Sequence, residues 1–193
     1  MPTRKRVKRG RWAAEWGKCM FHYNLLQVSF EELEWFKQQP DFMDAYEEFI
    51  YSNSITYSSN PDQPPGREIT LEDYDASLLM TSVNPPLESW FTPEEMLFSR
   101  ALVYGKQEID PSQNLSYNSP ADVADIASEL ETLPLASLRG IFEEDAVRFG
   151  MPKSPALDCN EEILHYQSAL FKWVTEFYQS ARMQGYAVLI HWN

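Results

Sequence analysis

The chain has 193 residues, of which 44% are hydrophobic, and it contains six Trp, ten Tyr and eleven Phe. This composition excludes an intrinsically disordered protein, because such chains are poor in aromatic and branched residues, and the length fits one folded domain. Two cysteines are too few for a disulfide framework, and no apolar run is long enough for a membrane span or the core of a signal peptide. The sequence therefore predicts a protein of a reducing cytoplasm that does not bind membranes.

Charge is divided unevenly along the chain. Of 16 basic and 29 acidic residues, seven basic and one acidic residue lie in the first 20 positions, which leaves nine against 28 for the remainder. Residues 21–193 thus carry a net charge of −19 within an overall −13. A body this acidic repels nucleic acid and anionic membranes and attracts cationic proteins. Charge alone predicts a basic protein partner.

The N-terminal residues 1–19 read as a basic, flexible arm or extension, and residues 20–193 as a single acidic domain. The basic side chains of the arm are Arg4, Lys5, Arg6, Lys8, Arg9, Arg11 and Lys18. Three interpretations stay open. The arm binds nucleic acid, or it docks on the acidic body of its own or a partner chain, or it is an upstream extension of a protein that begins at Met20.

The first predicted elements follow the arm closely. Residues 21–28 are rich in aromatic and branched side chains, which favours a strand. Ser29 and Glu32 have the spacing of a capping box, so a helix should begin there and end before Pro40. A second helix is expected over residues 41–51, followed by a long loop over residues 52–69.

Caps and prolines predict the elements of the middle of the chain. The expected helices span about 70–80, 92–104 with Gly105 as the stop, a segment that starts at Ser119-Pro120, and about 134–150.

The C-terminal segment carries the longest amphipathic pattern. A helix is predicted over about 160–184, with Gly185 as its end. Residues 186–191 are apolar on both faces and predict a buried strand, which should pair with the strand at 21–28. The expected fold is therefore α+β, a helix-dominated single domain with a small sheet that includes both terminal strands.

Several segments together resemble the YfbM-like family of small bacterial domains of unknown function. They are Met20 to Tyr23, Ala101 to Gly105, Tyr117 to Ala127, Phe177 to Ala181 and Gly185 to Ile190. The chain departs from the family pattern at Asn118, where the family usually has Gly. The resemblance covers roughly residues 20–193 and implies an α+β fold, and it supplies no established activity.

No catalytic signature is present. Cys19 and His22 supply only half of a zinc site, so we expect no metal centre and no cofactor. The sequence also lacks a Gly-rich phosphate loop, a nucleophile elbow and an HExxH motif. This absence of motifs favours a protein that is not an enzyme, and an enzyme stays an alternative.

The leading interpretation is a protein-binding module whose acidic surface engages a basic partner, for example an immunity protein that neutralises a cationic bacterial toxin. Its aromatic residues near loops are candidate interface anchors. These are Tyr51, Tyr57, Tyr74 and Trp90.

Two alternatives remain. The protein could be a small-molecule enzyme with a pocket between the sheet and the helices around Tyr104, Tyr117 and His191. Nucleic-acid binding through residues 1–19 is the other alternative.

Overall fold

The computed structural model describes most of the body of the chain. The described residues are 22–72, 75–76, 79, 97–110, 114–133 and 160–192. The basic arm, the helix predicted over 134–150, Cys19, Tyr74 and Trp90 lie outside them.

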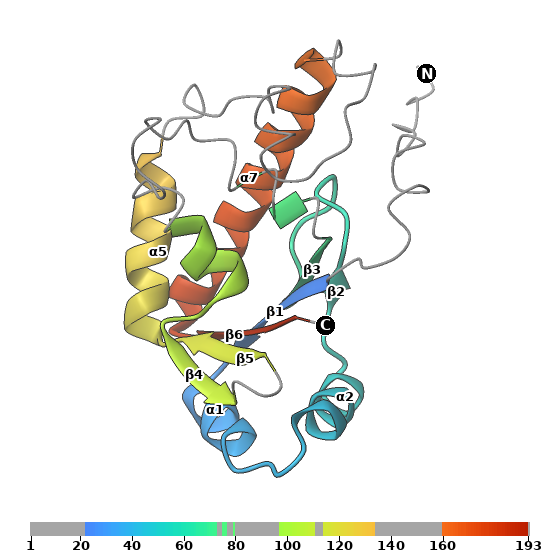
Figure 1. The fold of residues 1–193 in the computed structure, drawn as a ribbon, viewed down its shortest axis with the longest axis vertical. Coiled ribbons are helices and arrows are strands. Elements are labelled where there is room, and N and C mark those ends of the chain that lie inside the picture. The colour runs from blue at the N-terminus through green and yellow to red at the C-terminus, as the bar shows by residue number, and fades with distance from the viewer. Residues whose placement is uncertain are drawn as a thin grey trace.

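A six-stranded mixed sheet runs through the centre of the described fold (Figure 1). In spatial order its strands are β2 (Tyr57–Ser58), β3 (Glu68–Glu72), β1 (His22–Val28), β6 (Ala187–Trp192), β5 (Leu115–Asn118) and β4 (Gln107–Asp110). The β2–β3 pair is parallel and the other pairs are antiparallel. The two terminal strands, β1 and β6, are neighbours, with Leu25 opposite Ile190, and this confirms their predicted pairing.

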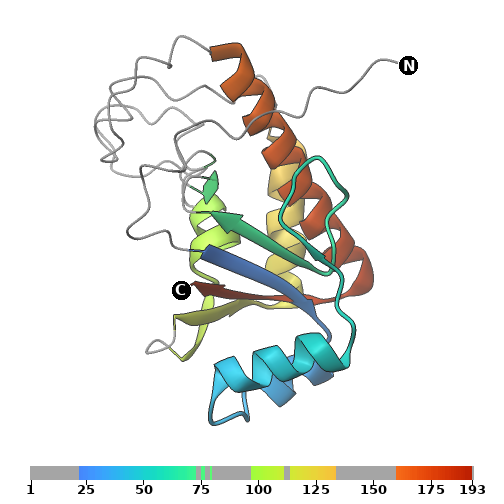
Figure 2. The same cartoon turned by 90° about the vertical axis from the view of Figure 1, so that its right-hand side faces the viewer.

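Helices cover both faces of the sheet, as Figure 2 shows from the side. One face carries α1 (Phe30–Phe36) and α2 (Phe42–Ser52). The other carries α5 (Pro120–Thr132), α7 (Asn160–Gln184) and the π-helical turn η2 (Ser99–Val103). The predicted α+β fold is confirmed. None of the described helices is both long and apolar enough to cross a membrane.

The sheet separates two apolar cores because successive side chains of a strand point to opposite faces. On β1, Leu25 belongs to the larger core under α5 and α7, whereas Leu26 belongs to the smaller core under α1 and α2. Phe177 of α7 is fully buried in the larger core, and Phe36 of α1 is 1% exposed in the smaller one. Both helical layers are therefore held on the sheet by burial of apolar surface.

The predicted caps place the first two helices correctly. The N–H of Glu32 donates to Ser29 Oγ at 3.2 Å, and the N–H of Ser29 donates to the Glu32 carboxylate at 2.6 Å. This reciprocal pair is the capping box expected at the start of α1. Asp41 caps α2 by accepting from the N–H groups of Met43 and Asp44.

The largest error of the sequence prediction concerns β2 and β3. The loop over 52–69 contains β2 and the start of β3, and Thr70 lies within β3 instead of capping a helix. Ile69 and Leu71 are both fully buried, and the strand pairs with β1 over five positions. The Thr70 hydroxyl donates to Asn24 across that pair at 2.7 Å. Cross-strand pairing outweighed the local capping pattern, and the described residues that follow, Asp75, Ala76 and Leu79, are helical.

The segment before Gly105 also differs from a regular helix. Among the described residues of the helix predicted over 92–104, Ser99–Val103 form a π-helical turn in which the N–H of Tyr104 donates to Ser99 O at 2.8 Å. A Cβ on Gly105 would lie 2.4 Å from the backbone of Tyr117. The absence of a side chain at Gly105 therefore lets the chain pass close to β5. The strands β4 and β5 were not predicted from the sequence.

Side chains from distant elements hold this π-helical turn. The Tyr178 hydroxyl donates to Ala101 O at 2.6 Å, and Asn118 Nδ2 donates to Arg100 O at 2.8 Å. Asn118 Oδ1 accepts from the N–H of Lys106 at 3.1 Å. Asn118 is fully buried, and its side chain joins the π-helical turn to β5.

The C-terminal elements agree with their predictions. Ser119 caps α5 in a capping box with Asp122, and Pro120 is the first residue of the helix. The helix α7 ends before Gly185, which has a φ of +67°. This left-handed conformation favours Gly, and it turns the chain directly into β6.

Candidate functional site

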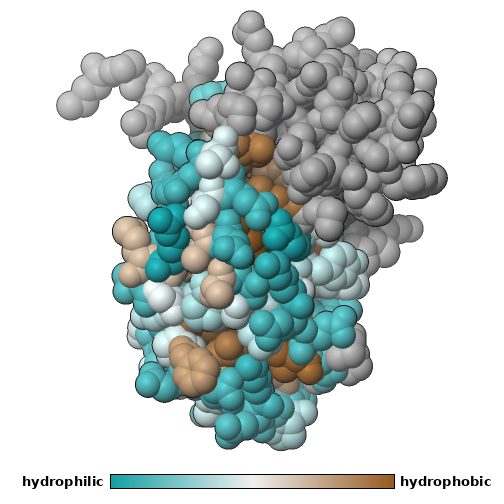
Figure 3. Space-filling view, turned by 90° about the vertical axis from the view of Figure 1, so that its left-hand side faces the viewer, coloured by the Kyte–Doolittle hydropathy of each residue, from teal (hydrophilic) through white to brown (hydrophobic). Residues whose placement is uncertain are grey.

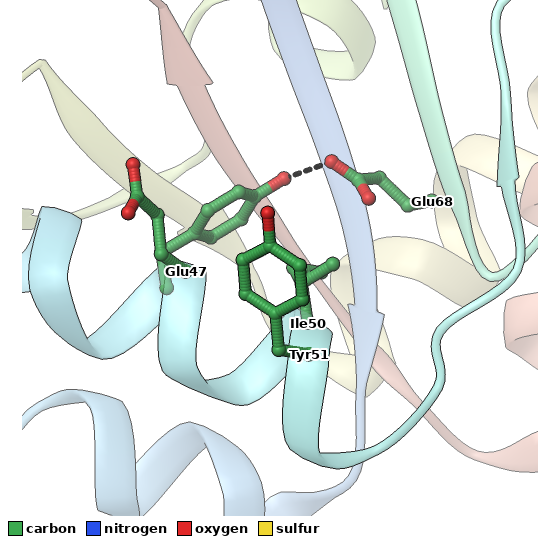
Figure 4. A pocket seen from close by; sticks show the side chains of 5 residues that line it. Glu47, Ile50, Tyr51 and Glu68 are labelled. Carbon is green, nitrogen blue, oxygen red and sulfur yellow. Dashed lines mark hydrogen bonds between the residues drawn. The ribbon is translucent and has the colours of Figure 1, made fainter.

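A hollow of about 230 Å³ lies between α2 and the start of β3 (Figure 4). Its lining combines aromatic, acidic and aliphatic side chains: Tyr46, Glu47, Ile50, Tyr51 and Glu68. In Figure 4 the side chains of Glu47 and Glu68 lie on opposite sides of the Tyr51 ring. The hollow is therefore bounded by two carboxylates and two phenol rings.

Helical periodicity places the α2 side chains of this hollow. Phe42, Ala45 and Phe49 form the buried stripe of α2, as expected for spacings of three and four residues. Tyr46 and Ile50, one position further along, are half-buried, whereas Glu47 and Tyr51 are exposed. The hollow thus forms along the boundary between the buried and exposed sides of α2.

Strand alternation places Glu68. Ile69 and Leu71 point into the larger core, so Glu68 points to the face that α1 and α2 cover. The residue is only 6% exposed, and the Tyr46 hydroxyl donates a hydrogen bond to its carboxylate. The sequence prediction missed Glu68 because it lay in a predicted loop.

Glu68 is a buried carboxylate that forms no ion pair with the described residues. Among the described residues, no Lys or Arg forms an ion pair with it, and adjacent Arg67 pairs with Glu32 instead. Burial raises the pKa of Glu68, and the hydrogen bond from Tyr46 opposes this only in part. Burial and the nearby Glu68 raise the pKa of Tyr46, so its hydroxyl remains a proton donor at neutral pH.

His191 of β6 packs against Phe42 and Tyr46 of α2, on the side of the sheet that holds the smaller core. Its ring centroid is 5.4 Å from that of Phe42 and 6.3 Å from that of Tyr46. The residue is 4% exposed, and its Nδ1 has no hydrogen-bond partner in the described part of the chain. Burial lowers the pKa of His191, so the ring is neutral at neutral pH.

The three residues predicted to surround an enzyme pocket occupy different environments. Tyr104 is 59% exposed, and Tyr117 is 8% exposed. The Tyr117 hydroxyl donates to Gln107, and Lys37 Nζ lies 4.6 Å from its ring centroid. His191 instead faces α2. None of the three lines the hollow beside α2, and the enzyme pocket stays a prediction.

Two of the four predicted interface anchors fall within the described residues. Tyr51 is 84% exposed and lines the hollow, and Tyr57 on β2 is 57% exposed. The sequence prediction did not name Phe30 and Trp35 of α1 as interface anchors, and they are 65% and 37% exposed. They lie beside the buried Leu33 and Phe36 in a helix of seven residues, and so short a pattern does not separate its buried and exposed sides.

The helical layer of α1 and α2 is strongly acidic. Residues 29–52 contain seven acidic residues and one basic residue. Glu34 pairs with Lys37 at 2.8 Å, and Glu32 pairs with Arg67. The other five form no ion pair with any described residue, and we call them the acidic face: Glu31, Asp41, Asp44, Glu47 and Glu48.

The helix α5 has a similar density of carboxylates, but each has a cation beside it. Its ion pairs are Lys106 with Asp122 at 2.9 Å and with Asp125 at 3.9 Å, Arg100 with Glu129 at 2.8 Å, and Arg182 with Glu131 at 3.2 Å. Figure 3 shows the side of the molecule that carries α5, where the surface is mainly hydrophilic with separate apolar patches. Charge on α5 is therefore compensated within the chain.

The described residues contain no group of three or more His, Cys, Asp or Glu side chains placed to hold a metal ion. The hollow offers hydrogen-bond acceptors, a phenol donor and aromatic faces. This chemistry suits a positively charged group.

The fold defines a single-sheet α+β domain with helices on both faces. It is similar to the crystal structure of a protein of unknown function, YfbM from Escherichia coli, with a TM-score of 0.56 and 11% sequence identity over 89% of this chain and 98% of that chain. No family model and no curated protein matches the sequence. The likeness supports a YfbM-like fold, and membership of the family stays a prediction.

Proposed function

We propose that this protein is a binding module that engages a basic protein through the acidic face of α1 and α2. The observation that carries the proposal is the contrast in charge compensation: the five carboxylates of the acidic face have no ion pair among the described residues, whereas all four of α5 do. A partner that supplied Lys and Arg would complete the missing pairs. An immunity protein that masks a cationic toxin would use such a surface.

Exposed aromatic residues beside this charge support the proposal. Tyr51, Phe30 and Trp35 are exposed on the same two helices. Large aromatic side chains dominate the binding energy of many interfaces, and surrounding charges speed and orient association. The surface thus combines anchors with long-range attraction for a cationic partner.

Photo-crosslinking with the full chain tests the proposal. We would replace Tyr51 with p-benzoylphenylalanine, irradiate in native host lysate and identify adducts by mass spectrometry. Met183 on α7, which is 81% exposed against 84% for Tyr51, is the matched control position. We expect a basic protein to crosslink from position 51 and not from position 183, and the yield to fall at about 1 M salt, where the screening length is about 3 Å.

Two triple variants separate a local surface from net charge. Asp44→Asn, Glu47→Gln and Glu48→Gln remove three charges from the acidic face. We expect the first variant to weaken binding of the identified protein by at least about tenfold. The control, Asp125→Asn, Glu129→Gln and Glu131→Gln on α5, removes the same number and should change binding by less than about twofold. Equal losses would contradict a specific acidic face.

Nucleic-acid binding through the basic arm remains a separate hypothesis. A full-length variant with Arg4, Lys5, Arg6, Lys8 and Arg9 replaced by Gln would lose retention on DNA or RNA if the arm is responsible. The same variant should retain the crosslink from position 51.

A further inference from the structure

We propose that the hollow beside α2 is a subsite for one Lys or Arg side chain of the basic partner. This inference rests on the proposed function and adds the place where a single cation is bound. It assigns Glu68 as the carboxylate that contacts the cation, Tyr51 as the aromatic wall and Glu47 as an exposed carboxylate on the far side of that ring.

The first support is the state of Glu68. The residue is 6% exposed and lines the hollow, and its carboxylate accepts a hydrogen bond from the neutral Tyr46 hydroxyl. Among the described residues, no cation faces it. Unpaired charge is costly to bury, and pairing with a cation recovers much of that cost. A cation that entered the hollow would supply the partner that the described chain lacks.

The second support is the composition of the walls. Tyr46 and Tyr51 both line the hollow, and Ile50 adds an aliphatic surface. A Lys or Arg side chain has an apolar stem and a charged end, and its charge interacts favourably with aromatic faces. The stem would pack against Ile50 and Tyr51 while the charged end reaches Glu68.

Size favours one side chain over a larger ligand. The hollow measures about 230 Å³, below the roughly 300–1,000 Å³ of pockets that take drug-sized molecules. Glu47 also lines the hollow and is exposed to solvent. The cation would therefore enter the hollow from the solvent at the acidic face. Both features match a residue that projects from a protein surface.

The test uses small probes and the full chain. We would titrate ¹⁵N-labelled protein with N-acetyl-lysine methylamide and N-acetyl-arginine methylamide, and follow the amide shifts of Ile50 and Tyr51 by NMR. N-acetyl-norleucine methylamide, which lacks the charge, is the control probe. We expect saturable shifts of these amides with at least one cationic probe and not with the norleucine probe.

Variants locate the bound cation. Glu68→Gln should weaken binding of the responding probe by about tenfold, and Tyr51→Leu by about fivefold. Tyr51 is largely exposed, so its replacement leaves the fold intact. Glu48 is the neighbour of Glu47 and does not line the hollow. The control variant Glu48→Gln removes its charge and should weaken binding of the probe by less than about twofold.

Three results would overturn the subsite: equal shifts with the norleucine probe, shifts that map away from α2 and β3, or equal losses in Glu68→Gln and Glu48→Gln. Failure of this inference is distinguishable from failure of the proposed function. A basic protein crosslinked from position 51, together with no response to either cationic probe, would retain the binding module and remove the subsite.

Discussion

The helix α5 and the layer of α1 and α2 lie on opposite faces of one sheet, and they differ in how many of their carboxylates form ion pairs. On α5, every carboxylate has a Lys or Arg within ion-pair distance. On α1 and α2, five of seven carboxylates form no such pair with a described residue. Net charge alone hides this difference. It shows that an acidic surface indicates a partner only where the chain does not already neutralise it.

The first prediction tests whether the two layers differ only in their surfaces. Phe36→Ala under α1 and Phe177→Ala in α7 each remove a buried ring, so each should lower the free energy of unfolding by about 3–5 kcal/mol. Urea unfolding followed by circular dichroism measures both. A loss below about 1 kcal/mol for Phe36→Ala alone would show that the layer of α1 and α2 is loosely attached. The two layers would then differ in packing as well as in surface charge.

The second prediction compares one carboxyl from each face. Burial raises the pKa of Glu68 above its ordinary value of 4.5. The folded state then binds its proton more tightly than the unfolded state, so this group lowers stability as pH rises from 4.5 through the folded pKa. Glu68→Gln should therefore stabilise the protein by about 1 kcal/mol at pH 7, and the gain should vanish below pH 4.5.

Asp122 is the opposite case. Burial acts to raise the pKa of Asp122, but the hydrogen bonds from Ser119 and Lys106 outweigh it and hold the pKa below 3.8. Stability from this carboxylate is present above that pH and is lost as pH falls through the folded pKa. Asp122→Asn should cost about 0.5–1 kcal/mol at pH 7 and less in acid. Unfolding curves for both variants from pH 3 to pH 7 check the two signs, and equal signs at pH 7 would contradict the comparison.

The third and smallest effect concerns exposed charge. Glu48 lies four residues after Asp44 on α2, and like charges at this spacing repel. Glu48→Gln should raise stability by about 0.3 kcal/mol. Glu131→Gln on α5 removes the ion pair with Arg182 at 3.2 Å and should lower stability by about 0.5 kcal/mol. Thermal unfolding at low salt measures the stability change of each variant, and 1 M salt should reduce both changes.

Much of the fold could be predicted because its decisive features are local. Ser29 with Glu32 and Ser119 with Pro120 identify helix starts within four residues. Gly185 marks the end of α7, and the apolar run after it identifies β6. The pairing of the terminal strands followed from their apolar character.

The strand β3 shows where local patterns failed. Thr70 has the side chain of a helix cap, yet its hydroxyl bonds Asn24 of β1. Pairing with β1 on one side and β2 on the other makes a strand more favourable here than the start of a helix. The same reason explains β4 and β5, which are four residues each and gain stability from pairing with each other and with β6.

The candidate site was predicted in part. Tyr51 was named as an interface anchor near a loop; it is 84% exposed, and its role as an anchor stays a prediction. Glu68 was missed, because its burial depends on α2 packing over β3. His191 was placed on the last strand, but its contacts with Phe42 and Tyr46 come from a helix about 145 positions earlier in the chain.

Local sequence accounts for the acidic balance, the helix caps, the terminal strands and the α+β class, since each depends on composition or on residues within a few positions of one another. The tertiary structure decided which carboxylates are neutralised and where a hollow forms. Ion pairs such as Arg100 with Glu129 join separate elements, and the Tyr46–Glu68 contact joins a helix to a strand. Such distances are set by packing against the sheet, so they cannot be obtained from local sequence.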